Sequence, residues 1–384
     1  MRIARWISRT AAALAAAAFA FGGVSHAQGG FSTTATSAII MDAGTGITLF
    51  CENCREPMPP ASMSKLMTIL LVAEAIEAGR INENTRFRVS ENAWRHGAMS
   101  DGSHMFLAIN SEVRVGDLLR GLSIVSANDA CIVLAEGLAG GEAQFVDQMN
   151  RRAVELGLTT ARFRNATGLP DPDHVISPYD LARLTRMIIT RFPAIYRLDA
   201  ERSFTYNNRT QENRNPLLGL FPGADGVKTG HTNASGYGMV GSAVLNGQRR
   251  IIVFNGMPSM AARRSEAERM MRAAFYDFRV TAMYPENATV GEAEVWLGSK
   301  KTVPLVTKNA IAIGMANAAR GGARAAIVYQ GPVPAPISEG QEIAKLVVEG
   351  PAFPRREFPL YAGRRVGRAN WFARAWTGLG SLGK

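Results

Sequence analysis

The stretch that most constrains this chain runs from Pro59 to Ile76 and reads PPASMSKLMTILLVAEAI. Its apolar residues recur at intervals of three and four, which predicts a helix packed against a core. The two prolines mark the start of that helix. Ser62 and Lys65 are three residues apart, so they stand on one helix face with Cβ atoms about 5–6 Å apart.

A hydroxyl beside an amine can form a nucleophile and its base. Serine is a poor nucleophile until a base takes its proton. Lysine serves as that base only when burial or a nearby positive charge lowers its pKa. The N–H groups at a helix start also favour developing negative charge. Taken alone, this spacing is frequent by chance and fits a capped helix with a solvated lysine better, so other motifs must decide.

Two further motifs follow along the chain. Ser126-Ala127-Asn128 interrupts two helical runs and presents a hydroxyl and an amide on a turn, where it could also be a helix N-cap. Lys228-Thr229-Gly230 opens the first of three predicted strands within residues 223–257, where it could also be an ordinary strand end. Asn246-Gly247 predicts a hairpin between the last two of these strands. Each motif is weak alone, but the ordered set on helix, turn and strand is specific.

Ser-x-x-Lys, Ser-x-Asn and Lys-Thr-Gly in this order resemble the motifs of penicillin-binding proteins and β-lactamases. The chain looks most like the low-molecular-mass penicillin-binding proteins, which are serine-type D-alanyl-D-alanine carboxypeptidases. The resemblance runs from about Ser37 to Phe278 and rests on EPMPPASMSKLMT, SENAWRHGAMSDGSHMFL, SANDACIVLAEGLAGG, NATGLPDPDH and GVKTGHT. Familiar members read Ser-Gly-Asn in the second motif, where this chain has Ala127.

The resemblance implies a fold and a site. The fold is mixed α/β: an antiparallel sheet flanked by helices, an α-helical subdomain, and a small all-β C-terminal domain, with the active site in the cleft of the first part. Ser62 matches the nucleophile, Lys65 its base, and Ser126 a proton relay to the leaving D-alanine. The implied substrate-binding residues are Asn128, Lys228, Thr229, Gly230 and His231.

The expected binding roles differ from residue to residue. Asn128 would hold the substrate amide and position Lys65. Lys228 would attract the terminal carboxylate of the substrate and keep Lys65 neutral by like-charge repulsion. Thr229 would hold the same carboxylate, and the backbone N–H groups of Ser62 and His231 would form the oxyanion hole. Arg263 or Arg264 would add a contact to the carboxylate.

The implied activity is removal of the terminal D-alanine from peptidoglycan pentapeptide through a Ser62 acyl-enzyme that penicillin also forms. A peptidoglycan endopeptidase, a class A-like β-lactamase and a non-catalytic β-lactam sensor are the alternatives. Class A enzymes use a glutamate between the second and third motifs, and no glutamate occurs between Glu155 and Glu201. Rapid β-lactam hydrolysis is therefore not expected. The chemistry needs no metal or cofactor.

Four segments follow from composition. Residues 1–27 combine three arginines, an apolar run and a Ser-His-Ala end, which is typical of a signal peptide cleaved before Gln28. The catalytic domain is expected over residues 28–284 and a small β-rich domain over 285–355. Residues 356–384 form a basic tail.

The tail predicts a membrane-surface helix. The chain has a net charge of +11, and much of the surplus lies in the cations Arg355, Arg356, Arg364, Arg365, Arg368, Arg374 and Lys384. Tryptophans among basic residues suit an anionic membrane surface. Because the chain is expected to be exported, nucleic acid is not an expected partner. We expect a periplasmic protein that is peripheral on the outer face of the inner membrane.

The three cysteines leave two possibilities open. Cys51 and Cys54 could close a small disulfide in an oxidising compartment or remain two idle thiols. Cys131 lies in an apolar helical run and is expected in the core.

Overall fold

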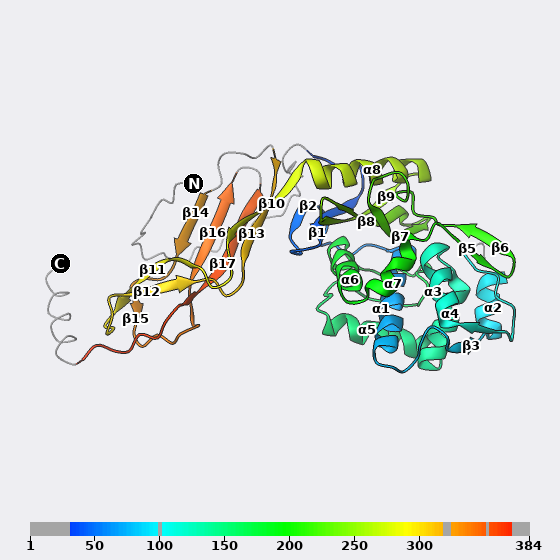
Figure 1. Ribbon diagram of the computed structural model, residues 1–384, viewed down its shortest axis with the longest axis horizontal. Helices are drawn as coiled ribbons and strands as arrows, with labels where there is room; N and C mark the ends of the chain where they lie inside the picture. The colour runs from blue at the N-terminus through cyan, green and yellow to red at the C-terminus, as the bar shows by residue number, and fades with distance from the viewer. Residues whose placement is uncertain (1–30, 99–101, 318–323, 351–352, 371–384) are drawn as a thin grey trace. The chain divides into compact units, whose positions relative to one another are not determined.

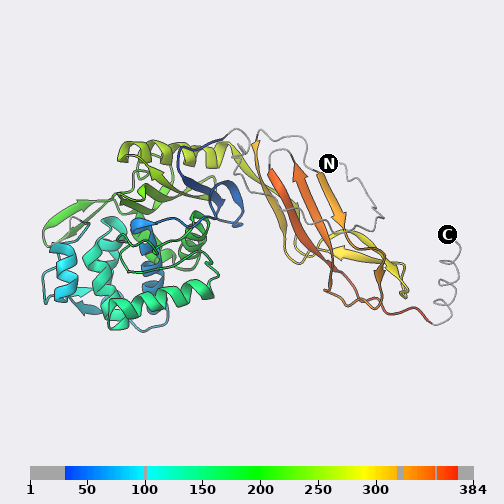
Figure 2. The ribbon, with the colours of Figure 1, turned by 180° about the vertical axis from the view of Figure 1, so that it is seen from behind.

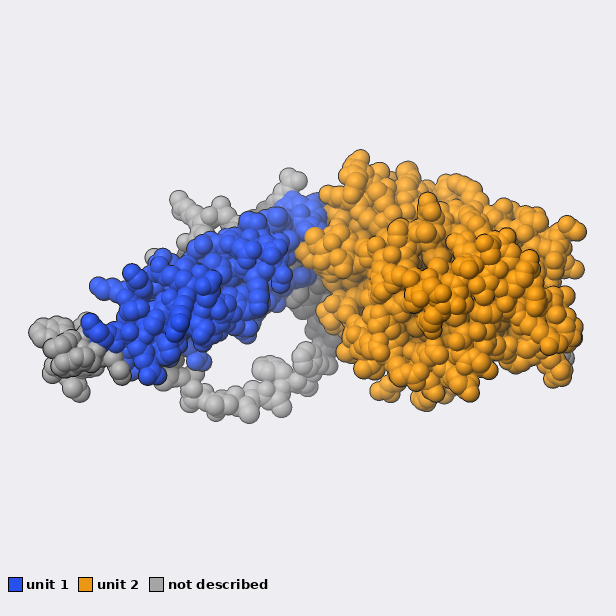
Figure 3. All heavy atoms as spheres, turned by 60° about the horizontal axis from the view of Figure 1, so that its bottom comes forward, with its two compact units in different colours: residues 1–30, 279–384 blue, residues 31–278 orange. Residues whose placement is uncertain are grey.

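The computed structural model describes residues 31–98, 102–317, 324–350 and 353–370. These residues form two compact units that divide after Phe278, which we call the larger unit (31–278) and the smaller unit (279–370) (Figure 3). The expected signal peptide lies outside the described residues, and so does most of the expected tail helix.

The larger unit is built on a five-stranded antiparallel sheet with the order β2-β1-β9-β8-β7. Its strands are β1 (Ser37–Asp42), β2 (Thr48–Glu52), β7 (Ala224–Thr232), β8 (Gly236–Leu245) and β9 (Gln248–Met257). The three strands predicted within residues 223–257 are confirmed. Asn246 and Gly247, both at positive φ, join β8 to β9, so the predicted tight hairpin is confirmed as well.

Helices cover both faces of this sheet. Every residue of β1 is buried; Ile39 and Met41 face the large helical core, while α8 packs on the other side (Figures 1 and 2). The helices are α1 (Lys65–Glu77), α2 (Glu91–Ala98), α3 (Val115–Ile124), α4 (Asn128–Ala139), α5 (Glu142–Glu155), α6 (Pro178–Arg191), α7 (Pro193–Tyr196) and α8 (Met260–Tyr276). Two hairpins, β3 (Arg86–Arg88) with β4 (Glu112–Arg114) and β5 (Ser203–Tyr206) with β6 (Arg209–Glu212), complete the unit.

Helix α1 is the predicted core helix. A short 3₁₀ turn, η2 (Ala61–Ser64), comes before it, so the helical run starts directly after the two prolines. Of its 13 residues, 10 are buried. A helix that is apolar on all sides belongs inside a protein, and this burial fixes the position of its first turn.

The cysteines settle what the sequence left open. Cys51 and Cys54 form a disulfide at the end of β2. Cys131 is a free thiol, fully buried in α4 as expected.

The smaller unit is all β and has its own core, which includes Leu305, Val348 and Leu360. A six-stranded sheet has the order β14-β16-β17-β12-β11-β15, and a two-stranded sheet pairs β10 with β13. The strands are β10 (Phe278–Tyr284), β11 (Thr289–Trp296), β12 (Thr302–Val306), β13 (Ile311–Ala316), β14 (Arg324–Val328), β15 (Val333–Pro334), β16 (Glu342–Gly350) and β17 (Phe353–Ala362).

The two units of the structure end at other residues than the domains predicted from the sequence. The ring of Phe278 contacts Phe31 and Phe50, which ends the larger unit there rather than at residue 284. Strand β10 then pairs with β13 of the smaller unit. At the other end, β17 pairs with β16, and Val366 still bridges to Ile337. The smaller unit therefore extends well beyond residue 355, into the segment expected to be tail.

Candidate active site

Ser62 and Lys65 meet at the junction of η2 and α1. The Lys65 Nζ lies 2.9 Å from Ser62 Oγ and 2.8 Å from Asn128 Oδ1, and it also contacts the backbone oxygen of Thr167. Lys65 is fully buried. A neutral amine has two N–H donors and one lone pair. If the amide and backbone oxygens take the two donors, the lone pair is left for the Ser62 hydroxyl.

The loop that presents Thr167 to the amine is folded around Asn165. The Asn165 Oδ1 accepts hydrogen bonds from the backbone N–H groups of Gly168 and Leu169, at 2.7 and 3.1 Å. Gly168 has a φ of +77°, and a Cβ there would lie 2.1 Å from the Ala61 oxygen. Only glycine allows this close approach to η2, the turn that carries Ser62 and that we call the nucleophile turn.

Ser126 stands on the turn between α3 and α4. Its φ is +63°, a left-handed conformation that is uncommon for a residue other than glycine. Its hydroxyl is buried and has no hydrogen-bond partner among the described residues. Ala127 holds the N-cap position without a side-chain cap, so capping by this motif is not observed. Asn128 is the first helical residue, and its side chain reaches Lys65 instead.

Strand β7 brings the third motif against the nucleophile turn. A Cβ on Gly230 would lie 2.8 Å from the Pro60 oxygen, so glycine lets the two backbones approach closely. Lys228 is 2% exposed and donates a hydrogen bond of 3.0 Å to the Thr229 oxygen. Its amine is therefore buried rather than on an open surface.

Burial dominates the electrostatics of the two lysines. Burial is the main reason that the pKa of Lys65 is lowered to about 8, and the Arg214 guanidinium contributes to the lowering. Burial also lowers the pKa of Lys228, and repulsion from Lys65 adds to that effect. Burial, with a contribution from Arg214, accounts for the low Lys65 pKa, and the expected role of Lys228 in keeping Lys65 neutral stays a prediction. A lysine with a pKa near 8 can act as a base at neutral pH.

A cavity of about 470 Å³ brings the three motifs together. Its walls include Ser62, Ser126, Thr229, Gly230 and His231, together with Gly102, Ser103, Arg214, Tyr237, Met260 and Arg263. The His231 ring stacks on Tyr237, with ring centroids 3.8 Å apart, and the Arg263 guanidinium lies over the other ring, 5.6 Å from its centroid. Of the two arginines that the sequence offered, Arg263 lines the cavity, whereas Arg264 is exposed.

Both units resemble domains of known proteins. The family model for D-alanyl-D-alanine carboxypeptidases matches residues 24–258. The carboxypeptidase DacF of Bacillus subtilis is 34% identical over 343 residues, covering 88% of this chain and 87% of the relative. The chain belongs to the D-alanyl-D-alanine carboxypeptidase family. A second family model, the C-terminal domain of penicillin-binding protein 5, matches residues 278–371.

Further members of the carboxypeptidase family resemble this chain in sequence and in structure. DacD of Escherichia coli is 36% identical over 345 residues, covering 88% of this chain and 89% of the relative. The crystal structure of penicillin-binding protein 5 from Haemophilus influenzae has a TM-score of 0.75 at 32% identity, covering 90% of this chain and all of the other. These likenesses confirm the expected fold: a mixed α/β domain with an antiparallel sheet, followed by an all-β domain.

Two residues of this carboxypeptidase site escaped sequence reasoning. Arg214 reaches the cavity from the segment after β6, and its guanidinium contacts the Ser103 hydroxyl. Asn165 folds the loop that binds Lys65. The Asn-Ala-Thr-Gly stretch that contains Asn165 was a visible signal, whereas nothing near Arg214 sets it apart from the other arginines. Among the described residues, no group of acidic, histidine and cysteine side chains could hold a metal ion.

Proposed function

We propose that this enzyme removes the terminal D-alanine from peptidoglycan stem peptides through an acyl-enzyme on Ser62. The contact that carries the proposal is the 2.9 Å approach of the buried Lys65 amine to the Ser62 hydroxyl. In acylation, Ser62 Oγ attacks the carbonyl carbon between the two D-alanines while its proton moves to Lys65 Nζ. The carbon–nitrogen bond then breaks, and the leaving amine takes up a proton.

Ser126 is suited to carry that proton. Its hydroxyl lines the same cavity as Ser62 and has no partner of its own among the described residues. A hydroxyl donates and accepts at once, so it can receive the proton from Lys65 and hand it to the departing D-alanine. Water then attacks the ester, and Lys65, neutral again, is the base nearest to Ser62 Oγ.

The substrate carboxylate has several cationic and polar partners in the same cavity. Arg214 and Arg263 line its wall beside Thr229, and guanidinium groups bind carboxylates with good geometry. Lys228, which precedes Thr229 on β7, is a further proposed partner of this carboxylate. The backbone N–H groups of Ser62 and His231 are the proposed oxyanion hole.

Mass spectrometry after penicillin treatment tests this proposal. We expect one covalent adduct on the peptide that contains Ser62, together with D-alanine release from a pentapeptide. A Lys65→Arg variant should lose adduct formation by about a thousandfold or more, because a guanidinium does not give up its proton. Lys308→Arg, a surface change in the smaller unit, is the control. An adduct elsewhere, or normal labelling of Lys65→Arg, would overturn the proposal.

The endopeptidase alternative uses the same groups on a different peptide. A cross-linked muropeptide dimer offers the D-alanyl bond of an endopeptidase substrate. Release of D-alanine from pentapeptide without cleavage of the dimer would support the carboxypeptidase, and the reverse result would support the endopeptidase. Persistent penicillin adducts would exclude an efficient β-lactamase, and turnover of the pentapeptide would exclude a sensor.

We also propose that the enzyme is exported and that residues 371–384 hold it on an anionic membrane surface. These residues carry Trp371, Phe372, Arg374 and Trp376, a mixture that suits the lipid interface. Among the described helices, none has the length and apolar character to cross a bilayer. Deleting 371–384 leaves the hydrogen bond from Ala369 N to the Leu297 oxygen in place. We expect this deletion to move the protein from the membrane to the soluble fraction with penicillin labelling intact; unchanged fractionation would contradict the anchor.

A further inference from the structure

A buried carboxyl group that the proposed chemistry leaves unused lies beside the third motif. Asp199 stands on a short 3₁₀ turn, η3 (Arg197–Ala200), which packs against strand β7. Its exposed fraction is only 2%. The ion pairs among the described residues engage its neighbours Glu201 and Asp225 but not Asp199 itself. A buried carboxylate is costly without a compensating charge, so this group calls for an explanation.

Asp199 packs directly on β7, two residues before Lys228. A Cβ on Gly226 would lie 3.3 Å from the Asp199 Cβ and 3.0 Å from the Tyr196 hydroxyl, so the glycine makes room for both side chains. Burial raises the pKa of Tyr196, and its phenol is therefore uncharged at neutral pH. Asp199 is thus the acid that lies against this part of the strand.

Lys228 points to the same face of the sheet as Asp199. Residues two apart on a strand share a face, and so do residues directly opposite on neighbouring antiparallel strands. Lys228 pairs with Val240 of β8, which belongs to the large helical core, and Gly226 pairs with Ser242, two residues further along β8. The Lys228 amine and the Asp199 carboxyl are therefore enclosed on the same side of β7, between the sheet and the helices.

The two groups act on each other's charge through this interior. Burial is the main reason that the pKa of Lys228 is lowered; Lys65 and Arg214 contribute to the lowering, whereas Asp199 opposes it. Burial raises the pKa of Asp199 to about 7, while the Ser123 hydroxyl and the Lys228 charge oppose that rise. Attraction between opposite charges is strong where water is excluded. Each group therefore favours the ionised form of the other.

The other acidic groups near this pair are already accounted for. Asp225 also lies on β7, but the Arg249 guanidinium binds its carboxylate at 2.7 Å. Cys131 faces Lys228 as well, but burial raises the pKa of this thiol to about 12, so it carries no charge at neutral pH. Asp199 is the acid that can balance the Lys228 charge.

We propose that Asp199 is the counter-charge that keeps Lys228 protonated, and that it thereby acts as a positioning residue for recognition of the terminal carboxylate of the substrate. This inference rests on the proposed function, in which Lys228 is a partner of that carboxylate. Asp199 does not line the active-site cavity, so it acts only through Lys228. An ammonium group attracts a carboxylate by charge, whereas a neutral amine does not. The buried acid therefore extends substrate binding to alkaline pH.

Two matched peptides isolate this effect. Acetyl-L-lysyl-D-alanyl-D-alanine is compared with its C-terminal amide from pH 6 to 10, and the ratio of the two kcat/KM values is followed. Because both peptides use the same nucleophile and base, the titration of Lys65 cancels in this ratio. An amide that is not turned over is compared by its inhibition of penicillin labelling.

In Asp199→Asn, the preference for the free carboxylate should be lost at a pH about one unit lower than in the unaltered enzyme, because a neighbouring negative charge is gone. At pH 6 the two enzymes should share the same ratio, because Asp199 is then mostly protonated. Asp199→Ser, a smaller uncharged replacement, is the second variant and should give the same shift.

Asp180→Asn is the matched control. This acid is equally buried, at 2% exposed, but it lies on α6 and binds Thr160, so its replacement should leave the profile of the ratio unchanged. If both Asp199 variants lower kcat/KM for the two peptides by one common factor at every pH, the role is structural and the inference is overturned, with the carboxypeptidase intact. If neither peptide is cleaved and penicillin leaves no adduct on Ser62, the proposed function itself fails.

Discussion

At the scale of single residues, the proposed chemistry depends on the charge of Lys65. The side chain is wholly buried and has three oxygen neighbours, and no carboxylate of the described residues makes a hydrogen bond or ion pair with it. Desolvation therefore acts on the ammonium without an ion pair to offset it. The same burial explains why a lysine can be a base here, whereas a solvated lysine could not.

The rate of acylation should follow the neutral fraction of Lys65. With a pKa of about 8, the second-order rate constant for a fluorescent penicillin should rise about tenfold per pH unit below that value and level off above it. Arg214→Gln removes a charge that lowers this pKa, so the midpoint should move to higher pH. A profile that is flat from pH 6 to 9 would contradict Lys65 as the base.

The lowered pKa of Lys65 also makes the stability of the fold depend on pH. Unfolded lysine has a pKa near 10.5, so between about pH 8 and 10.5 the folded chain binds fewer protons at this site than the unfolded chain. The free energy of unfolding contributed by Lys65 therefore rises with pH in that window. In Lys65→Met this part of the pH dependence should be absent from urea unfolding curves.

At the scale of elements, the site is held by a loop packed against a helix start. Gly168 allows the loop around Asn165 to approach the Ala61 carbonyl, and that contact brings the Thr167 oxygen to the Lys65 amine. The loop is therefore part of the machinery that orients the base, although none of its side chains reaches the active-site cavity.

Two glycine substitutions separate backbone strain from this close contact. Gly140 has a φ of +80° and no atom within 4 Å of a Cβ, so Gly140→Ala should lower the free energy of unfolding by only about 1 kcal/mol. Gly168→Ala adds a collision with backbone and should cost about 3 kcal/mol or more, with slower acylation. Urea unfolding and penicillin labelling measure both effects. Equal costs at the two positions would contradict the packing argument.

Sequence patterns predicted elements better than contacts between them. The three motifs lie on a helix start, a turn and a strand, as their flanking periodicities indicated. What the patterns missed depends on folding in three dimensions. Arg214 enters the cavity from a segment outside the three motifs, and Lys228 is buried and does not line the cavity. The last strand was hidden because its exposed face is charged, while Phe358 and Leu360 alternate inward.

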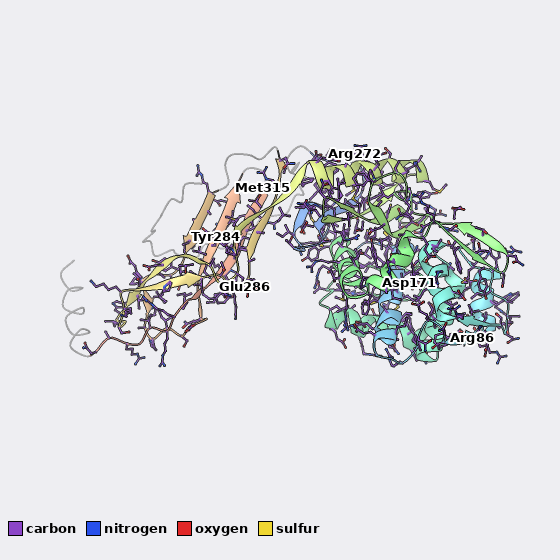
Figure 4. All side chains as sticks on the ribbon, viewed as in Figure 1. Arg86, Asp171, Arg272, Tyr284, Glu286 and Met315 are labelled. Carbon is purple, nitrogen blue, oxygen red and sulfur yellow. A yellow bond between two sulfur atoms is a disulfide. The ribbon has the colours of Figure 1, made fainter. Side chains whose placement is uncertain are left out.

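At the scale of the whole molecule, two separate cores support the two units. The larger unit contains all the residues that line the active-site cavity, and the smaller unit contributes none of them. Figure 4 labels Tyr284, Glu286 and Met315 on the smaller unit, whereas Asp171 belongs to the larger one. A destabilising substitution in the core of one unit should therefore leave the other unit folded.

Leu346→Ala tests this independence. Leu346 is 2% exposed within the core of the smaller unit, and truncating a buried leucine usually costs about 2–5 kcal/mol. Calorimetry should show a lower transition temperature for one of two transitions, with the penicillin acylation rate unchanged. Leu122→Ala, in the core of the larger unit, should shift the other transition. A single cooperative transition that moves in both variants would contradict separate units.

A second cavity, of about 310 Å³, is lined by the residues just before Ser62 and by Thr232 and Asp171. Its position next to the active-site cavity along β7 offers a route to selective inhibitors. A reactive β-lactam placed against Ser62 could carry an aliphatic amine arm past Thr232 towards Asp171. Because both contacts would belong to one compound, the second would form at a high effective concentration and add to the first. Enzymes with the same reactive serine but no acidic loop would gain nothing from the arm.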